Sequence, residues 1–230
     1  MVGTVLITGA SRGLGAALAV ELAARGARVV GVAREAAALV AAMEEIRRAG
    51  GEAHAVVADV GDPDAAATIA GRAAAMAGPV DVLVHNASTL GPTPLPLLAE
   101  VSPEQVARVF EVNLLGPFRL SRMLVGGMVL RGRGALVHVS SDAAAGAYPR
   151  WGPYGASKAA LDLLARTWAA ELAGTGVRSF AVDPGEMDTR MHADAMPDAD
   201  RATLARPADV ARRLADLVED PSVDGIRVAS

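Results

Sequence analysis

The 230-residue sequence contains no cysteine, which excludes disulfide bonds and thiolate metal sites, and no other metal site is predicted. It also lacks a run of 18 apolar residues, and no basic segment followed by an apolar stretch precedes its first strand. These absences predict a cytoplasmic protein that neither crosses nor binds a membrane. No run rich in lysine or arginine offsets the net charge of −4, so we expect small-molecule partners and no nucleic acid.

What the chain does contain is enough apolar sequence for one large core. Hydrophobic residues make up 52% and charged residues 21%, and no linker or repeat divides the chain, so we expect one domain over residues 1–230. Short β-branched runs alternate with helical segments, which predicts right-handed βαβ units around a parallel sheet. The strands are expected at 2–8, 27–32, 53–58, 80–84, 135–139, 177–182 and 225–228, and the longer helices at 35–49, 63–77, 102–130 and 153–173.

A glycine-rich loop directly follows the first strand, in the run Thr8-Gly9-Ala10-Ser11-Arg12-Gly13-Leu14-Gly15. Gly9 permits a tight turn, Gly13 lets the backbone approach a pyrophosphate, and Gly15 lets the next helix pack closely on the strand. Backbone N–H groups at the start of that helix would face the phosphates. The alternative is a tight strand–helix connection that binds no ligand.

Tyr154 and Lys158 lie four residues apart at the start of an apolar helical run, and therefore on one helix face. A nearby fixed positive charge favours a phenolate, so Lys158 is expected to lower the pKa of Tyr154 toward neutrality. Tyr154 could then exchange a proton with a substrate oxygen. The alternative is a core tyrosine with a solvated lysine.

These motifs occur together with others in one order: the glycine loop, Asn86-Ala87, Asn113, Ser141, the Tyr154/Lys158 pair and Pro184-Gly185. Over residues 2–228 this pattern closely resembles the compact, one-domain branch of the short-chain dehydrogenase/reductase family. The resemblance implies an α/β, doubly wound, seven-stranded parallel sheet (Rossmann fold). It also implies an enzyme that transfers a hydride between a nicotinamide cofactor and a small-molecule carbonyl/alcohol pair.

The resemblance also implies roles for four catalytic residues. Tyr154 is the general acid, Lys158 holds the nicotinamide ribose, Ser141 orients the carbonyl, and Asn113 kinks its helix and holds a water that links Lys158 to solvent. For Asn113, the alternative is an amide satisfied by a backbone carbonyl. The residues expected to bind the cofactor are Gly9, Ser11, Arg12, Gly13, Leu14, Gly15, Arg34, Asp59, Val60, Asn86, Ala87, Tyr154, Lys158, Pro184, Gly185 and Thr189.

Two residues beside Asn86-Ala87 depart from the family's usual Asn-Asn-Ala-Gly, namely His85 and Ser88. No metal-ligand or nucleophile spacing surrounds His85, so we expect a structural role for it. Ser88 and the following Thr89 are expected to add polar groups to the mouth of the active site.

The choice of cofactor is predicted from the end of the second strand. Family members that use NAD usually place an acidic residue there, whereas this chain has Ala33 followed by Arg34. Arg34 and Arg12 could both reach a 2′-phosphate, which predicts NADP(H) and makes NAD(H) the less favoured cofactor. The alternative is that both arginines are solvated surface charges.

Two further segments are expected near the substrate. Tyr148 and Trp151 precede Tyr154 and could contact a flat or apolar substrate, or else pack against the lid or a second subunit. Residues 190–206 are expected to form a short mobile lid, with Met187, Met191 and His192 in the pocket.

Self-association to a homodimer or homotetramer is expected through the exposed faces of the helices at 102–130 and 153–173. The apolar residues that motivate this expectation are Leu124, Met128, Leu164 and Trp168. The rival functions are an NADP(H)-sensing regulator without turnover and a sugar-nucleotide epimerase or dehydratase. The second rival would need a longer chain with a sizeable substrate domain.

Overall fold

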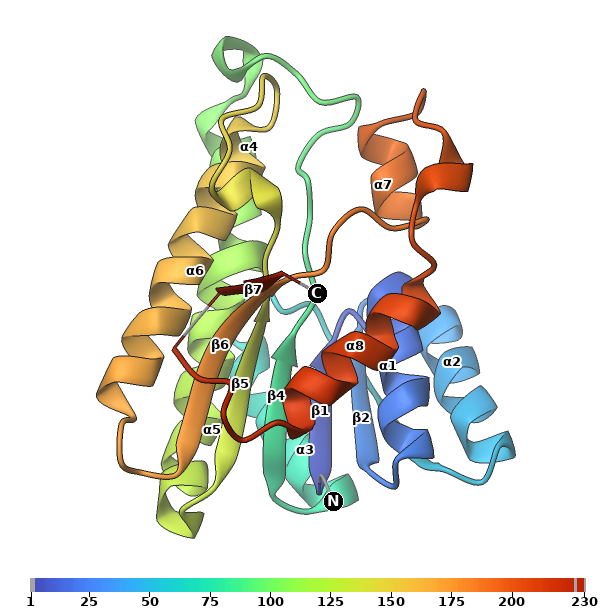
Figure 1. Cartoon of the computed structure of the whole chain (residues 1–230), viewed down its shortest axis with the longest axis vertical. Coiled ribbons are helices and arrows are strands. Elements are labelled where there is room, and N and C mark those ends of the chain that lie inside the picture. The colour runs from blue at the N-terminus through green and yellow to red at the C-terminus, as the bar shows by residue number, and fades with distance from the viewer. Residues whose placement is uncertain (1–2, 226, 230) are drawn as a thin grey trace.

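A computed structural model describes residues 3–225 and 227–229 (Figure 1). Seven parallel strands form one sheet in the order β3-β2-β1-β4-β5-β6-β7. The strands are β1 (Thr4–Thr8), β2 (Arg28–Ala33), β3 (Glu52–Val57), β4 (Val80–His85), β5 (Gly134–Val139), β6 (Val177–Asp183) and β7 (Arg227–Ala229). The α-helices are α1 (Gly13–Ala24), α2 (Ala36–Arg48), α3 (Ala65–Ala77), α4 (Pro103–Phe110), α5 (Gly116–Arg131), α6 (Gly152–Glu171), α7 (Arg190–Ala195) and α8 (Pro207–Glu219). The predicted doubly wound, seven-stranded sheet is therefore confirmed.

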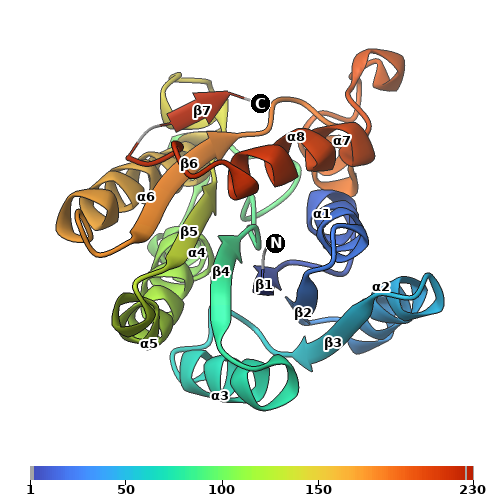
Figure 2. The ribbon, with the colours of Figure 1, turned by 60° about the horizontal axis from the view of Figure 1, so that its bottom comes forward.

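Helices cover both faces of the sheet, as Figure 2 shows. On one face, strand residues such as Val5 pack with Leu18 of α1, Leu39 of α2 and Leu214 of α8. On the other face, Leu6 belongs to a cluster that receives side chains from α3, α5 and α6. Successive residues of a strand thus pack into the apolar clusters on opposite faces of the sheet. For this reason these strands are apolar throughout and do not alternate between apolar and polar residues.

The long helix predicted at 102–130 is interrupted. Ser102 caps it as expected, because its hydroxyl accepts from the N–H of Gln105 while the Gln105 side chain accepts from the N–H of Ser102. The α-helical pattern then gives way to a π-helical segment, Glu111–Leu115, before α5 continues.

A second boundary also differs from the sequence prediction, since α3 begins at Ala65 rather than at residue 63.

Met128 lies in the core, which contradicts its predicted place on an exposed face. Its side chain is fully buried and packs over Gly134 at the start of β5, where an added Cβ would come within 2.8 Å of it. The apolar side chains that remain exposed on α5 and α6 include Met123, Leu130 and Leu163. No helix among residues 3–225 and 227–229 is long and apolar enough to cross a membrane.

The carboxyl ends of the strands meet along one edge of the sheet, where the strand order reverses between β1 and β4. Doubly wound sheets bind ligands in the crevice at this switch point. The predicted lid at 190–206 rises over the same edge as α7 and a 3₁₀ turn, Arg201–Thr203 (Figure 1). Its two ends are held together, because the N–H of Asp188 donates to the carbonyl of Ala205 at 2.9 Å.

Candidate active site

A cleft of about 1260 Å³ runs along this edge, from the glycine loop to α7. It brings together nearly all of the residues predicted from the sequence. Those that line it are Gly9, Ser11, Arg12, Gly13, Leu14, Arg34, Asp59, Val60, Asn86, Ala87, Ser141, Tyr154, Lys158, Pro184, Gly185 and Thr189. Two predicted residues, Gly15 and Asn113, do not line the cleft and act from behind its wall.

The glycine loop forms a cradle in which Gly9 and Gly15 have no space for a side chain. Gly9 has φ +70° and Gly13 φ +56°, a left-handed conformation that favours glycine. A Cβ on Gly15 would lie 2.3 Å from the carbonyl oxygen of Gly9, so a larger residue would push the helix away from the turn. The Asn86 side chain secures the turn by donating to the carbonyls of Thr8 and Gly9, at 2.9 and 3.2 Å. Backbone N–H groups at the start of α1 can therefore approach a pyrophosphate, and the cradle fits a dinucleotide.

Two ion pairs at the other end of the loop were not foreseen from the sequence. Arg12 forms an ion pair with Glu35, the residue that follows Arg34 in the sequence. Arg108 of α4 donates a hydrogen bond to Asp59 at 2.5 Å. Arg34 lies 4.0 Å from the same carboxylate. Burial acts to raise the pKa of Asp59, but the N–H of Gly61 and the Arg108 guanidinium outweigh it and hold that pKa below its usual value. Both arginines predicted to bind a 2′-phosphate therefore already face a carboxylate.

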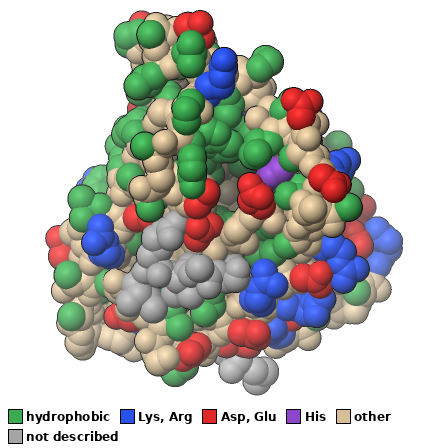
Figure 3. Space-filling model, turned by 45° about the horizontal axis from the view of Figure 1, so that its top comes forward, with side chains coloured by type: hydrophobic (Ala, Val, Ile, Leu, Met, Phe, Trp, Pro, Cys, Tyr) green, Lys and Arg blue, Asp and Glu red, His purple; other side chains and the backbone are tan. Residues whose placement is uncertain are grey.

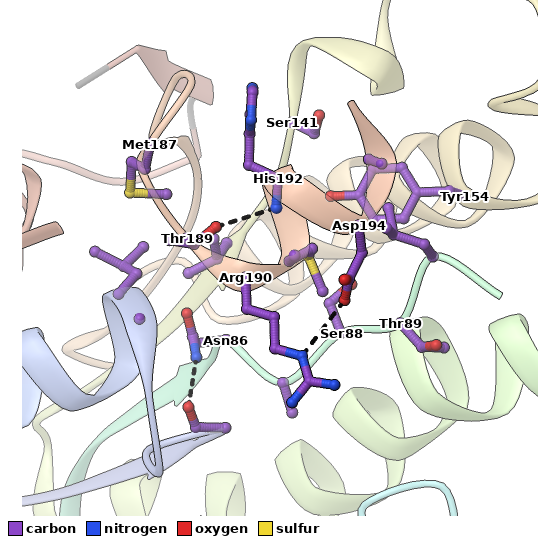
Figure 4. Close-up of a pocket in the computed structure, with 18 of the residues that line it drawn as sticks. Asn86, Ser88, Thr89, Ser141, Tyr154, Met187, Thr189, Arg190, His192 and Asp194 are labelled. Atoms are coloured by element: carbon purple, nitrogen blue, oxygen red, sulfur yellow. Dashed lines mark hydrogen bonds and ion pairs between the residues drawn. The ribbon is translucent and has the colours of Figure 1, made fainter. Parts of the chain in front are cut away.

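Tyr154 lies on the first turn of α6 and is almost fully buried, at 7% exposure. Its hydroxyl shares hydrogen bonds with the side chains of Ser141 and Ser88. Ser141, at the end of β5, also donates to Asp142 at 2.9 Å. Figure 4 shows Ser141, Tyr154 and Ser88 around the same part of the cleft. A carbonyl oxygen placed beside the Tyr154 hydroxyl would thus meet two hydroxyl groups held by separate strands.

Lys158 lies one turn further along α6, and only 1% of its surface is exposed to solvent. Its ammonium donates to the carbonyl of Val139 at 2.7 Å and lies 5.6 Å from the centre of the Tyr154 ring. Burial lowers the pKa of Lys158 to about 8, and Asp162, one further turn along α6, acts against this. The solvated lysine considered as an alternative is excluded, because this lysine lines the cleft from inside the protein.

The predicted lowering of the pKa of Tyr154 is wrong. Burial raises the pKa of Tyr154 to about 12, because it penalises the phenolate, and the charges of Asp142 and Asp183 raise it further. The hydrogen bonds from Ser141 and Ser88 only partly oppose this. Lys158 does not reverse the effect, because its ammonium is directed to the Val139 carbonyl and lies beside the ring rather than at the hydroxyl.

Asn113 lies in the π-helical segment that interrupts the helix, and the kink attributed to it stays a prediction. Its amide oxygen accepts from the N–H of Thr89 at 2.8 Å and from the hydroxyl of Ser88 at 3.1 Å. Its amide nitrogen donates to the carbonyl of Thr89 and to the hydroxyl of Ser157, both at 2.9 Å. The alternative, in which a backbone carbonyl accepts a hydrogen bond from the Asn113 amide, is therefore correct. Asn113 joins the loop at Ser88 to α6, and its part in a water relay stays a prediction.

His85 lies beneath the cleft and does not line it, in agreement with the structural role predicted for it. Its Nε2 is 2.8 Å from the hydroxyl of Ser121, and its ring stacks on His138 of β5 with centroids 4.9 Å apart. Burial lowers the pKa of both histidines, that of His138 to about 3, so both rings are neutral. This pair fills the layer between the sheet and α5.

The substrate end of the cleft is formed by the loop before Tyr154 and by the lid. Trp151 meets the Tyr154 ring edge-on at 5.6 Å, and both Trp151 and Ala195 of α7 pack against the apolar cluster that includes Tyr154, while Tyr148 is half-exposed. Trp151 also lines the cleft, and its contact with a substrate stays a prediction. The other predicted residues at this end, namely Ser88, Thr89, Met187, Met191 and His192, all line the cleft.

Comparisons with known proteins identify the family of this chain. The family model for the short chain dehydrogenases matches residues 3–200. The cis-4-hydroxycyclohexanecarboxylate dehydrogenase of Sinomonas cyclohexanicum is 39% identical over 225 residues, which cover 94% of this chain and 88% of that protein. A variant of the actinorhodin polyketide ketoreductase, solved with NADPH, superposes with a TM-score of 0.91 at 29% identity, covering 99% of this chain and 95% of that one. A metagenomic short-chain oxidoreductase solved with NADP gives 0.84 at 34% identity, covering 99% and 96%. The chain belongs to the short-chain dehydrogenase/reductase family.

Proposed function

We propose that the protein is an NADP(H)-dependent oxidoreductase that transfers a hydride between the nicotinamide and a small-molecule carbonyl/alcohol pair. The observation that carries the proposal is the buried Tyr154 hydroxyl, hydrogen-bonded to Ser141 in a cleft that also contains the glycine cradle. Relatives solved with NADPH and NADP support the choice of cofactor. Family membership supports the class of reaction.

The residues have distinct tasks in this reaction. When bound, NADPH supplies the hydride, which is chemistry the side chains cannot provide. Ser141 holds the substrate oxygen by a hydrogen bond, and Tyr154 passes its proton to that oxygen as the carbonyl is reduced. Lys158 keeps a positive charge on the inner wall, and Asn113 keeps Ser88 in place beside Tyr154.

The test is Tyr154→Phe, which removes the transferable proton and keeps the ring. General acid catalysis is worth roughly 10²–10⁴ in rate, so kcat should fall by at least about 100-fold while NADPH affinity changes little. Thr167→Val, which removes a hydroxyl from the exposed face of the same helix, is the control. A Tyr154→Phe enzyme that reduces carbonyl compounds at the normal rate would refute the mechanism, and NADPH binding without turnover in wild type would favour a sensing role.

The preference for NADP(H) over NAD(H) rests on Arg12 and Arg34, whose guanidinium groups line the adenosine end of the cleft. Both are substantially exposed, and Glu35 competes with a 2′-phosphate for Arg12. Exposed charge pairs contribute about 0.2–1 kcal/mol each, so we expect a preference of roughly tenfold in kcat/KM. If Glu35 did not compete for Arg12, the two arginines would predict a larger preference for NADPH.

This preference is measured as the ratio of kcat/KM for NADPH and NADH in wild type and three variants. Arg34→Ala should lower the ratio by about threefold or more, and Glu35→Gln should raise it by a similar factor because Arg12 is released. Arg72→Ala, on the exposed face of α3, is the control. A ratio that none of the cleft variants changes would mean that these charges do not select the cofactor.

A further inference from the structure

The substrate end of the cleft has an unbalanced set of charges. Apart from Lys158, the charged residues that line it from β5 to α7 comprise five carboxylates and one guanidinium. The carboxylates are those of Asp142, Asp183, Glu186, Asp188 and Asp194, and the guanidinium is that of Arg190. Figure 3 shows acidic side chains and a histidine around a hollow with hydrophobic walls. A cleft lined by one sign of charge concentrates ligands of the opposite sign.

Arginines within the described chain compensate only part of this negative charge. Asp188 pairs with Arg201 at 2.6 Å, and Asp194 lies 3.7 Å from Arg190 (Figure 4). Asp142 and Glu186 form no ion pair with a lysine or arginine among the described residues, and Nε2 of His192 lies 3.8 Å from the Glu186 carboxylate. The field of these carboxylates reaches the reacting group, since Asp142 and Asp183 both raise the pKa of Tyr154.

The loops at 86–93 and 139–151 offer no cationic side chain to an anion among the described lining residues. Arg150 is the one basic residue in the second of these loops, and it donates instead to the carbonyl of Leu95 at 2.9 Å, away from the cleft. A carboxylate or phosphate at this end would therefore lose water and meet five carboxylates against the two cationic side chains of Lys158 and Arg190.

The loop at 139–151 also carries groups that suit an organic cation. Trp151 and Tyr148 present aromatic rings at the mouth, and the hydroxyl of Tyr148 is hydrogen-bonded to Asp142. Aromatic faces attract ammonium groups, most strongly where a carboxylate is close and part of the water is displaced. Met187 and Met191 supply adaptable apolar contacts for the carbon skeleton.

We propose that this end of the cleft selects carbonyl or alcohol compounds that carry an ammonium group, and rejects those that carry a carboxylate or a phosphate. The inference rests on the proposed function, because it assigns a substrate class to that site. The ammonium group lies between the aromatic rings and the carboxylates of Asp142 and Glu186. The carbonyl then points inward to Ser141 and Tyr154.

A binding experiment tests this without turnover. Isothermal titration calorimetry of the NADPH-saturated enzyme compares benzyltrimethylammonium with phenylacetate, two ligands of similar size and opposite charge. At low ionic strength we expect the cation to bind about tenfold more tightly or better, and the difference to shrink in 1 M salt, where charges are screened within about 3 Å. The double variant Asp142→Asn/Glu186→Gln should lose about threefold or more of this selectivity, whereas Asp64→Asn, an exposed acid before α3, should keep it.

A second arm measures kcat/KM for aryl methyl ketones that carry a trimethylammonium, a tert-butyl or a carboxylate group at the same ring position. The first two have the same shape but activate the carbonyl to different degrees, so the charge effect is read from how far the double variant lowers the preference for the ammonium over the tert-butyl ketone. Phenylacetate binding as tightly as the cation, absence of any cation binding, or unchanged selectivity in the double variant overturns the inference. Selective cation binding with no reduction of any ketone counts instead against the proposed function and leaves the charge preference standing.

Discussion

Replacing Lys158 with methionine is expected to make the protein more stable while it abolishes activity. Burial lowers the pKa of Lys158 from about 10.5 to about 8, and each tenfold change in proton affinity is worth about 1.4 kcal/mol. Keeping this ammonium charged inside the fold at pH 7 therefore costs about 3 kcal/mol. Methionine has a similar length and no charge, but it leaves the Val139 carbonyl without its donor, which costs about 1–2 kcal/mol. The expected net gain in unfolding free energy is about 1–2 kcal/mol.

The pH dependence of stability separates this cause from simple repacking. The folded pKa lies below the unfolded value, so below about pH 8 both states are charged and wild type bears the whole penalty. Between about pH 8 and 10.4 the unfolded chain binds a proton that the folded protein does not, so wild-type stability rises with pH. Lys158→Met lacks this rise, and its advantage should shrink across the same window.

The assay is urea denaturation of wild type and Lys158→Met at pH 7 and pH 10. Lys158 is the only lysine in the sequence, so no other lysine titrates in this range. Ser157→Ala, one residue away and also buried, is a control that alters a hydrogen bond but no charge. The reasoning would be refuted if Lys158→Met were less stable than wild type at pH 7, or if its gain in unfolding free energy were the same at pH 10. Either result would show that the buried ammonium does not destabilise the folded protein.

The remaining predictions concern the cradle and the assembly. Gly15→Ala should lower stability by about 1–3 kcal/mol and weaken NADPH binding, because its Cβ would lie 2.3 Å from the Gly9 carbonyl oxygen. Gly71→Ala on α3, where a Cβ meets nothing within 4 Å, should be neutral or stabilising in the same thermal and fluorescence titrations, and equal behaviour of the two would contradict the steric argument. We also expect at least a dimer at micromolar concentration by light scattering, through exposed residues of α5 and α6 such as Met123 and Leu163, and a monomer would reject this.

The sheet and the ends of its strands could be predicted because each strand is marked by a short run of neighbouring residues in the sequence. Buried parallel strands are continuous apolar runs, so β1, β5 and β6 were placed to within two residues at each end. The residues that follow such strands must lie at one edge, which is why Ser141 and the glycine loop were brought together correctly. The side of a helix that faces the core was harder. The burial of Met128 depends on the space above Gly134, which only the packed structure contains.

Charge pairs were the part of the site that the sequence could not supply. Glu35 is 23 residues from Arg12, and Arg108 is 49 residues from Asp59, so neither pair follows any helical or strand spacing. The same is true of Asn113, whose amide is satisfied by a loop 24 residues away. Each of these contacts changes what a predicted residue is free to bind.

The raised pKa of Tyr154 fixes which protonation form the cleft holds at neutral pH. With a pKa of about 12, only about one phenol in 10⁵ is ionised at pH 7, so Tyr154 holds its proton. Carbonyl reduction needs this protonated form as the acid, whereas alcohol oxidation needs the phenolate as a base. Asp142 and Asp183 favour the protonated form further because they disfavour a second negative charge beside them. An ammonium group bound near Asp142 would offset part of that charge. The carboxylates that we propose to attract a cationic substrate therefore also favour the protonated form of Tyr154.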